Sequence, residues 1–164
     1  MFKEITPSEI DGNLIKAIAD EWMLISAGDS KKYNMMTASW GFMGEMWESD
    51  CVTAMIRPQR YTMEFVEKND YFTLSFYGEN KAIHKICGSQ SGRDVNKTEL
   101  TGLTPVFFDN TVYFDEARLV LICKKQYVQQ LEEDCFTDKT PLKWYENKDF
   151  HYMIIGKIEK ALIK

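Results

Sequence analysis

Short apolar segments rich in β-branched and aromatic residues recur along this sequence, and they constrain the fold more than any other feature. They cover residues 22–27, 35–42, 51–56, 71–77, 105–108, 111–114, 119–131 and 153–163. Segments of this composition are typical of β-strands. Asp109 and Asn110 separate two of them, and such a pair predicts a hairpin turn. Many short strands with tight turns favour a mainly β fold, an antiparallel barrel with a few short helices at its ends.

Short helices are predicted between the strands. They are expected over residues 6–10, 62–68, 80–87 and 95–100. Thr62 is expected to cap the second of these helices, and Gly88 to stop the third. The segment 139–150 is expected to be a loop that carries Trp144 and Tyr145.

Composition and charge exclude several classes of protein. The chain has 164 residues, enough for one domain over 1–164, and it is 45% hydrophobic and 13% aromatic, so a folded core is expected. The net charge of −5 argues against nucleic acid or an anionic membrane as a partner. No apolar run is long enough to span a membrane, and residues 1–4 have no signal-peptide pattern. A cytoplasmic location is therefore expected.

The four cysteines are widely spaced, at Cys51, Cys87, Cys123 and Cys135. They form no Cys-x-x-Cys pair, and no histidine lies at the spacing of a metal ligand. In a cytoplasmic chain they are expected to be reduced. We interpret them as small core residues on strands rather than as a redox or metal site.

The stretch from residue 34 to residue 62 combines two features that point to a ligand. Around Trp40 it sets small and hydroxyl residues, Thr37, Ala38, Ser39 and Gly41. Small residues let a backbone approach a flat ligand closely. An apolar segment then ends on two arginines, Arg57 and Arg60, which offer fixed forks for phosphate. A flat ring with a phosphate indicates a nucleotide-like cofactor.

A second stretch, over residues 88–97, offers several phosphate donors. These are Ser89, Ser91, Gly92, Arg93 and Lys97. Cations, hydroxyls and a flexible glycine within a few residues are what a phosphate requires. Taken singly, each feature has a plainer interpretation: a strand with a bulge at residues 37–41, a surface arginine before Pro58, and a solvated turn at residues 88–94.

Four motifs occur in a fixed order and carry a family resemblance. They are Asn34-x-x-Thr37-Ala38-Ser39-Trp40-Gly41, Arg57-Pro58-x-Arg60-Tyr61-Thr62, Asp70-Tyr71-Phe72-Thr73-Leu74-Ser75-Phe76 and Ser91-Gly92-Arg93-Asp94-x-x-Lys97. With these motifs the chain resembles the flavin reductase-like family, and more narrowly its flavoredoxin-like branch. The resemblance covers nearly the whole chain. It implies an antiparallel split β-barrel of Greek-key type that binds FMN and works as a homodimer, with the flavin near the dimer interface.

The resemblance also implies which residues contact the cofactor. Along the isoalloxazine ring it places Thr37, Ala38, Ser39 and Trp40. Along the ring and the ribityl phosphate it places Arg57, Pro58 and Arg60, supported by Tyr61 and Thr62. At the end of the next strand it places Ser75 and Phe76 close to the cofactor. Near the phosphate it places Ser89, Ser91, Gly92, Arg93 and Lys97.

The chain has two histidines, His84 and His151, and each has a possible structural role. His84 falls in a predicted helix and is expected to be exposed or partly buried there. His151 precedes the last strand, where the family often has a histidine facing the nicotinamide side of the flavin. It is the candidate for binding nicotinamide or donating a proton, and a structural histidine at a strand start is the alternative.

Two functions from different classes are compatible with the resemblance. One is an NAD(P)H-dependent flavin reductase, with NADH or NADPH as the electron donor for bound FMN. The alternative is a flavoredoxin-like electron carrier that keeps FMN bound and exchanges electrons with a redox protein partner. A third interpretation is a barrel that binds a flat ligand without turning it over. Aromatic residues over the outer flavin face, Trp47, Trp144 and Tyr145, would favour the carrier because they would restrict nicotinamide access.

Overall fold

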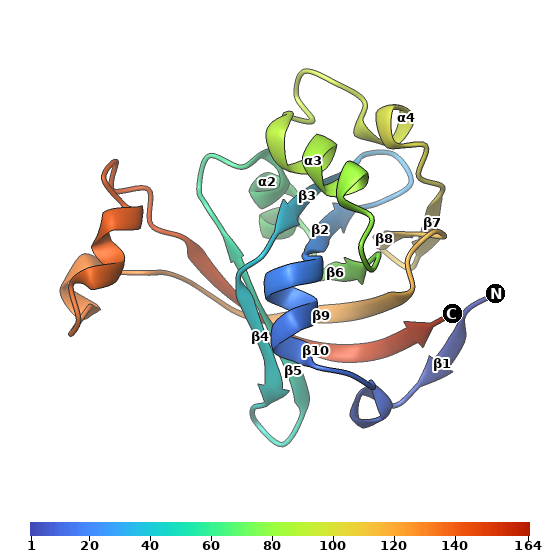
Figure 1. Ribbon diagram of the computed structural model, residues 1–164, viewed down its shortest axis with the longest axis horizontal. Coiled ribbons are helices and arrows are strands. Elements are labelled where there is room, and N and C mark those ends of the chain that lie inside the picture. Colours follow the sequence, from blue (N-terminus) through green and yellow to red (C-terminus); the bar gives the residue numbers. More distant parts are fainter.

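The computed structural model describes all residues from 1 to 164, and most of its strands form one antiparallel sheet (Figure 1). The strands are β1 (Lys3–Ile5), β2 (Met23–Gly28), β3 (Tyr33–Ala38), β4 (Gly41–Glu45), β5 (Asp50–Ile56), β6 (Tyr71–Phe76), β7 (Pro105–Phe108), β8 (Thr111–Phe114), β9 (Leu119–Gln130) and β10 (Tyr152–Ile163). Their order in the sheet is β3-β2-β6-β9-β10-β5-β4, with β1 beside β10. The predicted hairpin of β7 and β8 is confirmed as a separate two-stranded sheet.

The two edges of the sheet are joined by only two residues, Ser39 and Trp40. β3 and β4 stand at opposite ends of the strand order although they are neighbours in the chain. The sheet therefore curls until its edges almost meet, which makes a split barrel with a mainly antiparallel, Greek-key-type strand order. The prediction of one strand over residues 35–42 is wrong. The chain changes partners there, since Ala38 pairs with Met23 on β2 and Gly41 pairs with Ala54 on β5.

Both faces of the central strands are buried. Alternate residues of β2 belong to different clusters: Met23 and Ile25 face the barrel interior, and Leu24 faces the outer layer formed by α3 and the β7–β8 hairpin. β9 alternates in the same way, with Leu121 inside and Val120 outside. Burial on two sides explains why β2 and the first five residues of β9 are mostly apolar rather than alternating.

The helices are short, and all except η3 and η4 pack against the barrel (Figure 1). They are the 3₁₀ helices η1 (Pro7–Glu9), η3 (Glu133–Cys135) and η4 (Thr140–Trp144), the π-helix η2 (Ala17–Glu21), and the α-helices α1 (Leu14–Lys16), α2 (Tyr61–Lys68), α3 (Lys81–Ser89) and α4 (Lys97–Thr101). None of them combines the length and the apolar character needed to cross a membrane.

Several local predictions were wrong. β1 and the helical stretch from Leu14 to Glu21 were not predicted from the sequence. Arg60, not Thr62, holds the N-cap position of α2, and the buried Thr62 hydroxyl instead accepts a hydrogen bond from Asn34 Nδ2 at 2.9 Å. Gly88 lies inside α3 rather than beyond it.

The cysteines match their structural interpretation only in part. Cys51, Cys87 and Cys123 are buried, but Cys87 is on a helix rather than a strand. Cys135 is exposed on η3, contrary to the expectation of a core residue.

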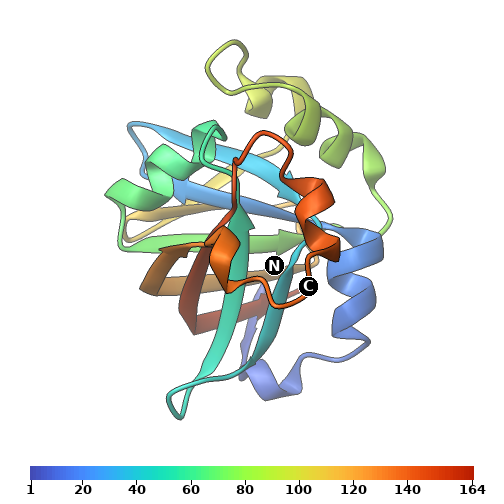
Figure 2. The same ribbon diagram turned by 90° about the vertical axis from the view of Figure 1, so that its left-hand side faces the viewer.

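Between β9 and β10 the chain leaves the barrel and returns, and we call residues 131–151 the arm (Figures 1 and 2). The arm projects from the barrel beyond β4 and β5 and has a small aromatic core of its own. The rings of Tyr145 and Phe150 stack at 4.7 Å between centroids, and Phe136 packs on both. Apart from η3 and η4 the arm is irregular. The prediction of a loop over 139–150 is therefore confirmed except over η4.

Candidate functional site

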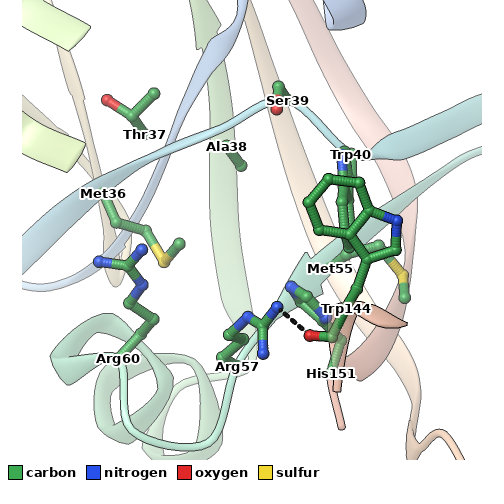
Figure 3. Close-up of a pocket in the computed structure, with 10 residues that line it drawn as sticks. All are labelled: Met36, Thr37, Ala38, Ser39, Trp40, Met55, Arg57, Arg60, Trp144 and His151. Carbon is green, nitrogen blue, oxygen red and sulfur yellow. Dashed lines mark hydrogen bonds between the residues drawn. The ribbon is translucent and has the colours of Figure 1, made fainter. Parts of the chain in front are cut away.

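A cavity of about 250 Å³ opens where β3, β5 and the arm meet (Figure 3). It is lined by Met36, Thr37, Ala38, Ser39, Trp40, Met55, Arg57, Arg60, Trp144 and His151. We call it the ring cavity. Because Ser39 and Trp40 join the two edges of the sheet, the cavity lies at the split of the barrel. Small residues, flexible methionines and two indoles are a suitable lining for a flat ring.

A second hollow of about 290 Å³ adjoins the first, and we call it the polar cavity. It is lined by Asn34, Met36, Gln59, Arg60, Tyr61, Thr62, Ser89, Gln90, Ser91, Gly92 and Lys97. Met36 and Arg60 line both cavities, so the two form one continuous depression along β3. No aspartate or glutamate lines either cavity, although the chain carries a net charge of −5. This local excess of cations favours an anionic ligand.

Lys97 is a buried cation without a carboxylate partner. Its side chain is 5% exposed, and its Nζ donates to the carbonyls of Met35 at 2.8 Å and Cys87 at 2.9 Å. Burial lowers the pKa of the Lys97 ammonium, and Arg60 adds to this effect. A buried charge that lacks a counter-ion is costly, so an anion in the polar cavity would stabilise it.

Arg60 and Lys97 are both held at the C-terminal end of α3. Arg60 Nη1 donates to the Gly88 carbonyl at 3.2 Å, one residue beyond the Cys87 carbonyl that Lys97 uses. The last carbonyls of a helix carry partial negative charge and attract cations. The helix therefore positions two cations at the wall of the polar cavity.

Arg57 fastens the arm to the barrel. Its Nη1 lies 2.6 Å from Asp149 Oδ2, and its Nη2 donates to the Trp144 carbonyl at 2.8 Å (Figure 3). Gln59 Nε2 donates to the same Asp149 oxygen at 2.7 Å. These bonds bring the Trp144 ring over the cavity, where it meets Trp40 edge to face at 5.7 Å between centroids. Arg57 thus serves the site by holding one of its walls.

His151 stands at the wall of the ring cavity with its side chain almost buried. It is 7% exposed, and its ring lies 5.0 Å from that of Trp40 between centroids. Its Nδ1 is 2.8 Å from Tyr145 Oη. Burial lowers the pKa of His151 to about 4, with a further decrease from Arg57, so the imidazole is neutral near pH 7.

Thr37 is fixed from behind by α3. Its hydroxyl donates to the His84 carbonyl at 2.7 Å and lies 3.4 Å from His84 Nδ1. The prediction of an exposed or partly buried His84 is wrong, because the side chain is 1% exposed between the rings of Trp22 and Tyr77. Burial lowers the pKa of His84 to about 4, and Lys81 lowers it further.

Most of the residues predicted from sequence gather around the two cavities. The residues that line one or both are Thr37, Ala38, Ser39, Trp40, Arg57, Arg60, Thr62, Ser89, Ser91, Gly92, Lys97 and His151. Arg93 lies nearby but turns toward α2, where it pairs with Glu64 and covers the Tyr61 ring at 4.4 Å. Pro58 is exposed and lines neither cavity. Ser75 and Phe76 have 0% exposure and lie in the core, away from both.

Five lining residues were not predicted: Asn34, Met36, Met55, Gln59 and Gln90. The alternation of β3 could have indicated two of them, since Asn34 and Met36 lie on the same side of the strand as Ala38. Met55 faces the cavity only because β5 passes beside the arm, and that proximity leaves no trace in the sequence.

The two cavities together fit a flavin mononucleotide. Met36, Ala38 and Trp40 offer surfaces for a flat ring, and the polar cavity offers serine hydroxyls, amides and two cations for a phosphate. Lys97 has only carbonyl partners, so a phosphate bound in the polar cavity would neutralise its charge. No group of three or more His, Cys, Asp or Glu side chains could hold a metal ion.

Comparison with known proteins agrees with this geometry. The model of a family described as "Flavin reductase like domain" matches residues 15–164. The chain belongs to this family. The family match therefore agrees with the resemblance carried by the four sequence motifs and with the split barrel of the structure. None of the proteins with curated functions matches the chain.

Several solved structures share the fold of this flavin reductase-like domain. The flavoredoxin of Methanosarcina acetivorans aligns over 95% of this chain and 75% of its own, with a TM-score of 0.68 and 20% identity. The flavoredoxin of Desulfovibrio vulgaris (Miyazaki F) aligns over 94% and 77%, with a TM-score of 0.69 and 19% identity. An FMN-binding domain of a flavin reductase-like enzyme from Shewanella baltica aligns over 99% and 77%, with a TM-score of 0.68 and 18% identity.

Proposed function

We propose that the chain is an FMN-binding flavoprotein over a single domain, residues 1–164, and an NAD(P)H-dependent flavin reductase. The observation that carries the proposal is the pair of adjoining cavities, which combine a ring-sized apolar wall with an acid-free cationic pocket. When bound, FMN supplies the two-electron redox chemistry. The protein's own residues supply binding, orientation and electrostatics.

Each wall has a task in this proposal. Thr37, Ala38 and Ser39 offer backbone and hydroxyl groups to the polar edge of the ring. Arg60 and Lys97 stabilise the phosphate, and Trp40 with Trp144 limits the space on the open side of the ring cavity. A donor near the ring nitrogens stabilises the negative charge that reduction places on the flavin.

Access to the ring cavity bears on the choice between reductase and carrier. Trp40 is 39% exposed and Trp144 is 54% exposed, so they form open walls rather than a closed cover. An open cavity leaves room for a nicotinamide beside the flavin and favours the reductase. The contact of Trp144 with Trp40, held by Arg57, favours the flavoredoxin-like electron carrier with tightly bound FMN, and we keep this as the second candidate.

The cofactor assignment is tested by comparing the binding of FMN and riboflavin, which differ only in the phosphate. Purified protein without flavin is titrated with each, and quenching of flavin fluorescence reports binding. We expect Arg60→Gln to weaken FMN binding about 10-fold, roughly the effect of one lost charge-assisted hydrogen bond, and to leave riboflavin binding unchanged. Arg118→Gln is the matched control, because Arg118 pairs with Glu21 and lines neither cavity. Equal losses for both ligands would place the phosphate elsewhere.

The choice between reductase and carrier is tested by anaerobic addition of NADH and then NADPH to the FMN-loaded protein. Rapid bleaching of the flavin absorption supports the reductase and identifies the preferred donor. A flavin that neither nucleotide bleaches supports the electron carrier, which would be reduced by a redox protein partner. The cytoplasmic location expected from the sequence stays a prediction.

A further inference from the structure

The Tyr145–His151 pair is the most buried hydrogen-bonded couple of titratable side chains at the ring cavity. Tyr145 is 6% exposed and His151 is 7% exposed, and Tyr145 Oη lies 2.8 Å from His151 Nδ1. Both residues lie in the last seven positions of the arm, but only His151 lines the ring cavity. The pair therefore connects the packing of the arm to a side chain that lines the ring cavity.

The direction of this hydrogen bond follows from the partners available. The Tyr145 hydroxyl has one proton to donate, and the one acceptor within hydrogen-bond distance in the chain is His151 Nδ1. If Nδ1 carried the imidazole proton and donated it, the buried hydroxyl proton would have no acceptor, and that arrangement is unfavourable. Tyr145 is thus the donor, Nδ1 is the acceptor, and the proton of the neutral imidazole lies on Nε2.

The surroundings keep both groups in these protonation states. Burial raises the pKa of the Tyr145 phenol, so the hydroxyl keeps its proton near pH 7. Three charged groups act on His151: Arg57 and Arg60 lower its pKa, and Asp149 raises it. Burial has the largest effect and also lowers the pKa, so together with the two arginines it outweighs Asp149, and the imidazole stays neutral.

The orientation of Tyr145 is itself fixed by packing. Its ring stacks on Phe150 at 27° between planes and also contacts Phe136. The Arg57 guanidinium lies over the ring in a cation–π contact, 5.2 Å from its centroid. A side chain held by three neighbours can hold the imidazole in one ring orientation and one tautomer.

We propose that Tyr145 is a positioning residue that fixes His151 as the Nε2–H tautomer, so that His151 presents a neutral hydrogen-bond donor to the ring cavity. This inference rests on the proposed function for its ligand: the donor would select a second ring that carries an acceptor, such as the carbonyl oxygen of a carboxamide or a ketone. It assigns the arm a role, because the arm supplies the residue that sets the chemistry of the cavity.

Nitrogen-15 NMR of the imidazole side chains tests the tautomer directly, in protein without flavin. With only two histidines, the His84→Gln variant assigns the signals. We expect His151 at pH 7 to show a protonated Nε2 and an unprotonated, hydrogen-bonded Nδ1. In Tyr145→Phe we expect a mixture of the two neutral tautomers. A protonated Nδ1 in the unmodified chain, or an unchanged tautomer in Tyr145→Phe, would overturn the proposal.

Kinetics of flavin reduction by NADH provide the second measurement, on FMN-loaded protein. We expect Tyr145→Phe to lower the rate constant about 10-fold at an unchanged FMN affinity, the effect of one misoriented donor. Tyr113→Phe on the β7–β8 hairpin is the matched control, since Tyr113 makes no hydrogen bond through its hydroxyl and lies outside the arm. Loss of FMN affinity equal to the loss of rate would show that Tyr145 only supports the fold. Because the NMR result needs no flavin, failure of FMN binding and failure of the tautomer are distinguishable.

Discussion

At the scale of single residues, the site depends on charges held by carbonyl oxygens and by one carboxylate. Arg60 and Lys97 bind the end of α3, whereas Arg57 binds Asp149 and the Trp144 carbonyl. Two sequence motifs of the family resemblance predicted that all three lie at one site, and the structure brings them to the walls of two adjoining cavities. Their individual partners were not predictable, because a motif does not show which carbonyl or carboxylate group the fold places beside each cation.

The variants Arg57→Ala and Asp149→Asn separate two roles of Arg57. If Arg57 acts mainly through the arm, both changes loosen Trp144, and we expect FMN affinity to fall about 10-fold in Arg57→Ala and about 3-fold in Asp149→Asn. Equilibrium titration with FMN measures both, and Trp144 fluorescence in the background of the other three tryptophans reports the loosened wall. Tighter FMN binding in Asp149→Asn would instead show that Arg57 acts on the ligand and that Asp149 competes for it.

At the scale of elements, the strands were largely predictable and the closure of the barrel was not. Central segments such as β6 and the first five residues of β9 are recognisable because both of their faces are buried, which makes them mostly apolar. The break at Ser39 and Trp40 was missed because it arises from a change of strand partner, and no local turn signal marks it. β1 was missed because three residues are too few for a periodic pattern, and it is held by pairing with the other end of the chain.

The loop after α3 depends on a close approach to β3. A Cβ atom at Gly92 would lie 2.1 Å from Asn34 Oδ1, and Asn34 is buried and bonded to Thr62. Gly92→Ala must displace this asparagine and break its hydrogen bond. We expect a loss of about 1–3 kcal/mol in the free energy of unfolding, the usual range for overpacking, together with weaker FMN binding.

Gly44→Ala on β4 is the matched control for this change, because nothing lies within 4 Å of its added Cβ. Urea denaturation of both variants without flavin measures the stabilities, and FMN titration measures the binding. If Gly92→Ala is as stable as Gly44→Ala, the loop moves freely from β3 and does not form a fixed wall of the polar cavity.

At the scale of the whole molecule, two buried histidines make stability depend on pH. Both His84 and His151 have a pKa of about 4 in the folded chain, below the ordinary value of about 6.5 for the unfolded chain. Between these two values the unfolded state binds more protons, so the free energy of unfolding decreases as the pH falls from about 6.5 to about 4.

The expected slope is up to about 1.4 kcal/mol per pH unit for each histidine within that window. Urea denaturation at several pH values between 4.5 and 7 measures it on flavin-free protein. His151→Gln removes one titrating group, and we expect it to reduce the slope by about half. A free energy of unfolding that does not change between pH 7 and 5 would show that both imidazoles accept protons in the folded chain.

The outer face of the split barrel carries exposed apolar side chains that a lone chain would leave in water. Ile15 is 78% exposed and Phe42 is 70% exposed, and both line an apolar groove of about 500 Å³ between the Leu14–Glu21 helical stretch and β4. Ser39 and Trp40 belong both to this groove and to the ring cavity, so whatever covers the groove also borders the flavin site. We propose that a second copy of the chain covers it, which is the homodimer expected from the family resemblance.

Phe42→Glu tests this dimer, because a charge placed in an apolar interface is unfavourable by several kcal/mol. We expect the unmodified chain to sediment as a dimer and Phe42→Glu as a monomer with weaker FMN binding. Leu100→Glu is the matched control, since Leu100 is 50% exposed on α4 and lines neither the groove nor either cavity, and it should remain dimeric. Analytical ultracentrifugation over a range of concentrations distinguishes these states. A monomeric unmodified chain that binds FMN would mean that one copy completes the site alone, and the groove would then be the candidate surface for a redox protein partner.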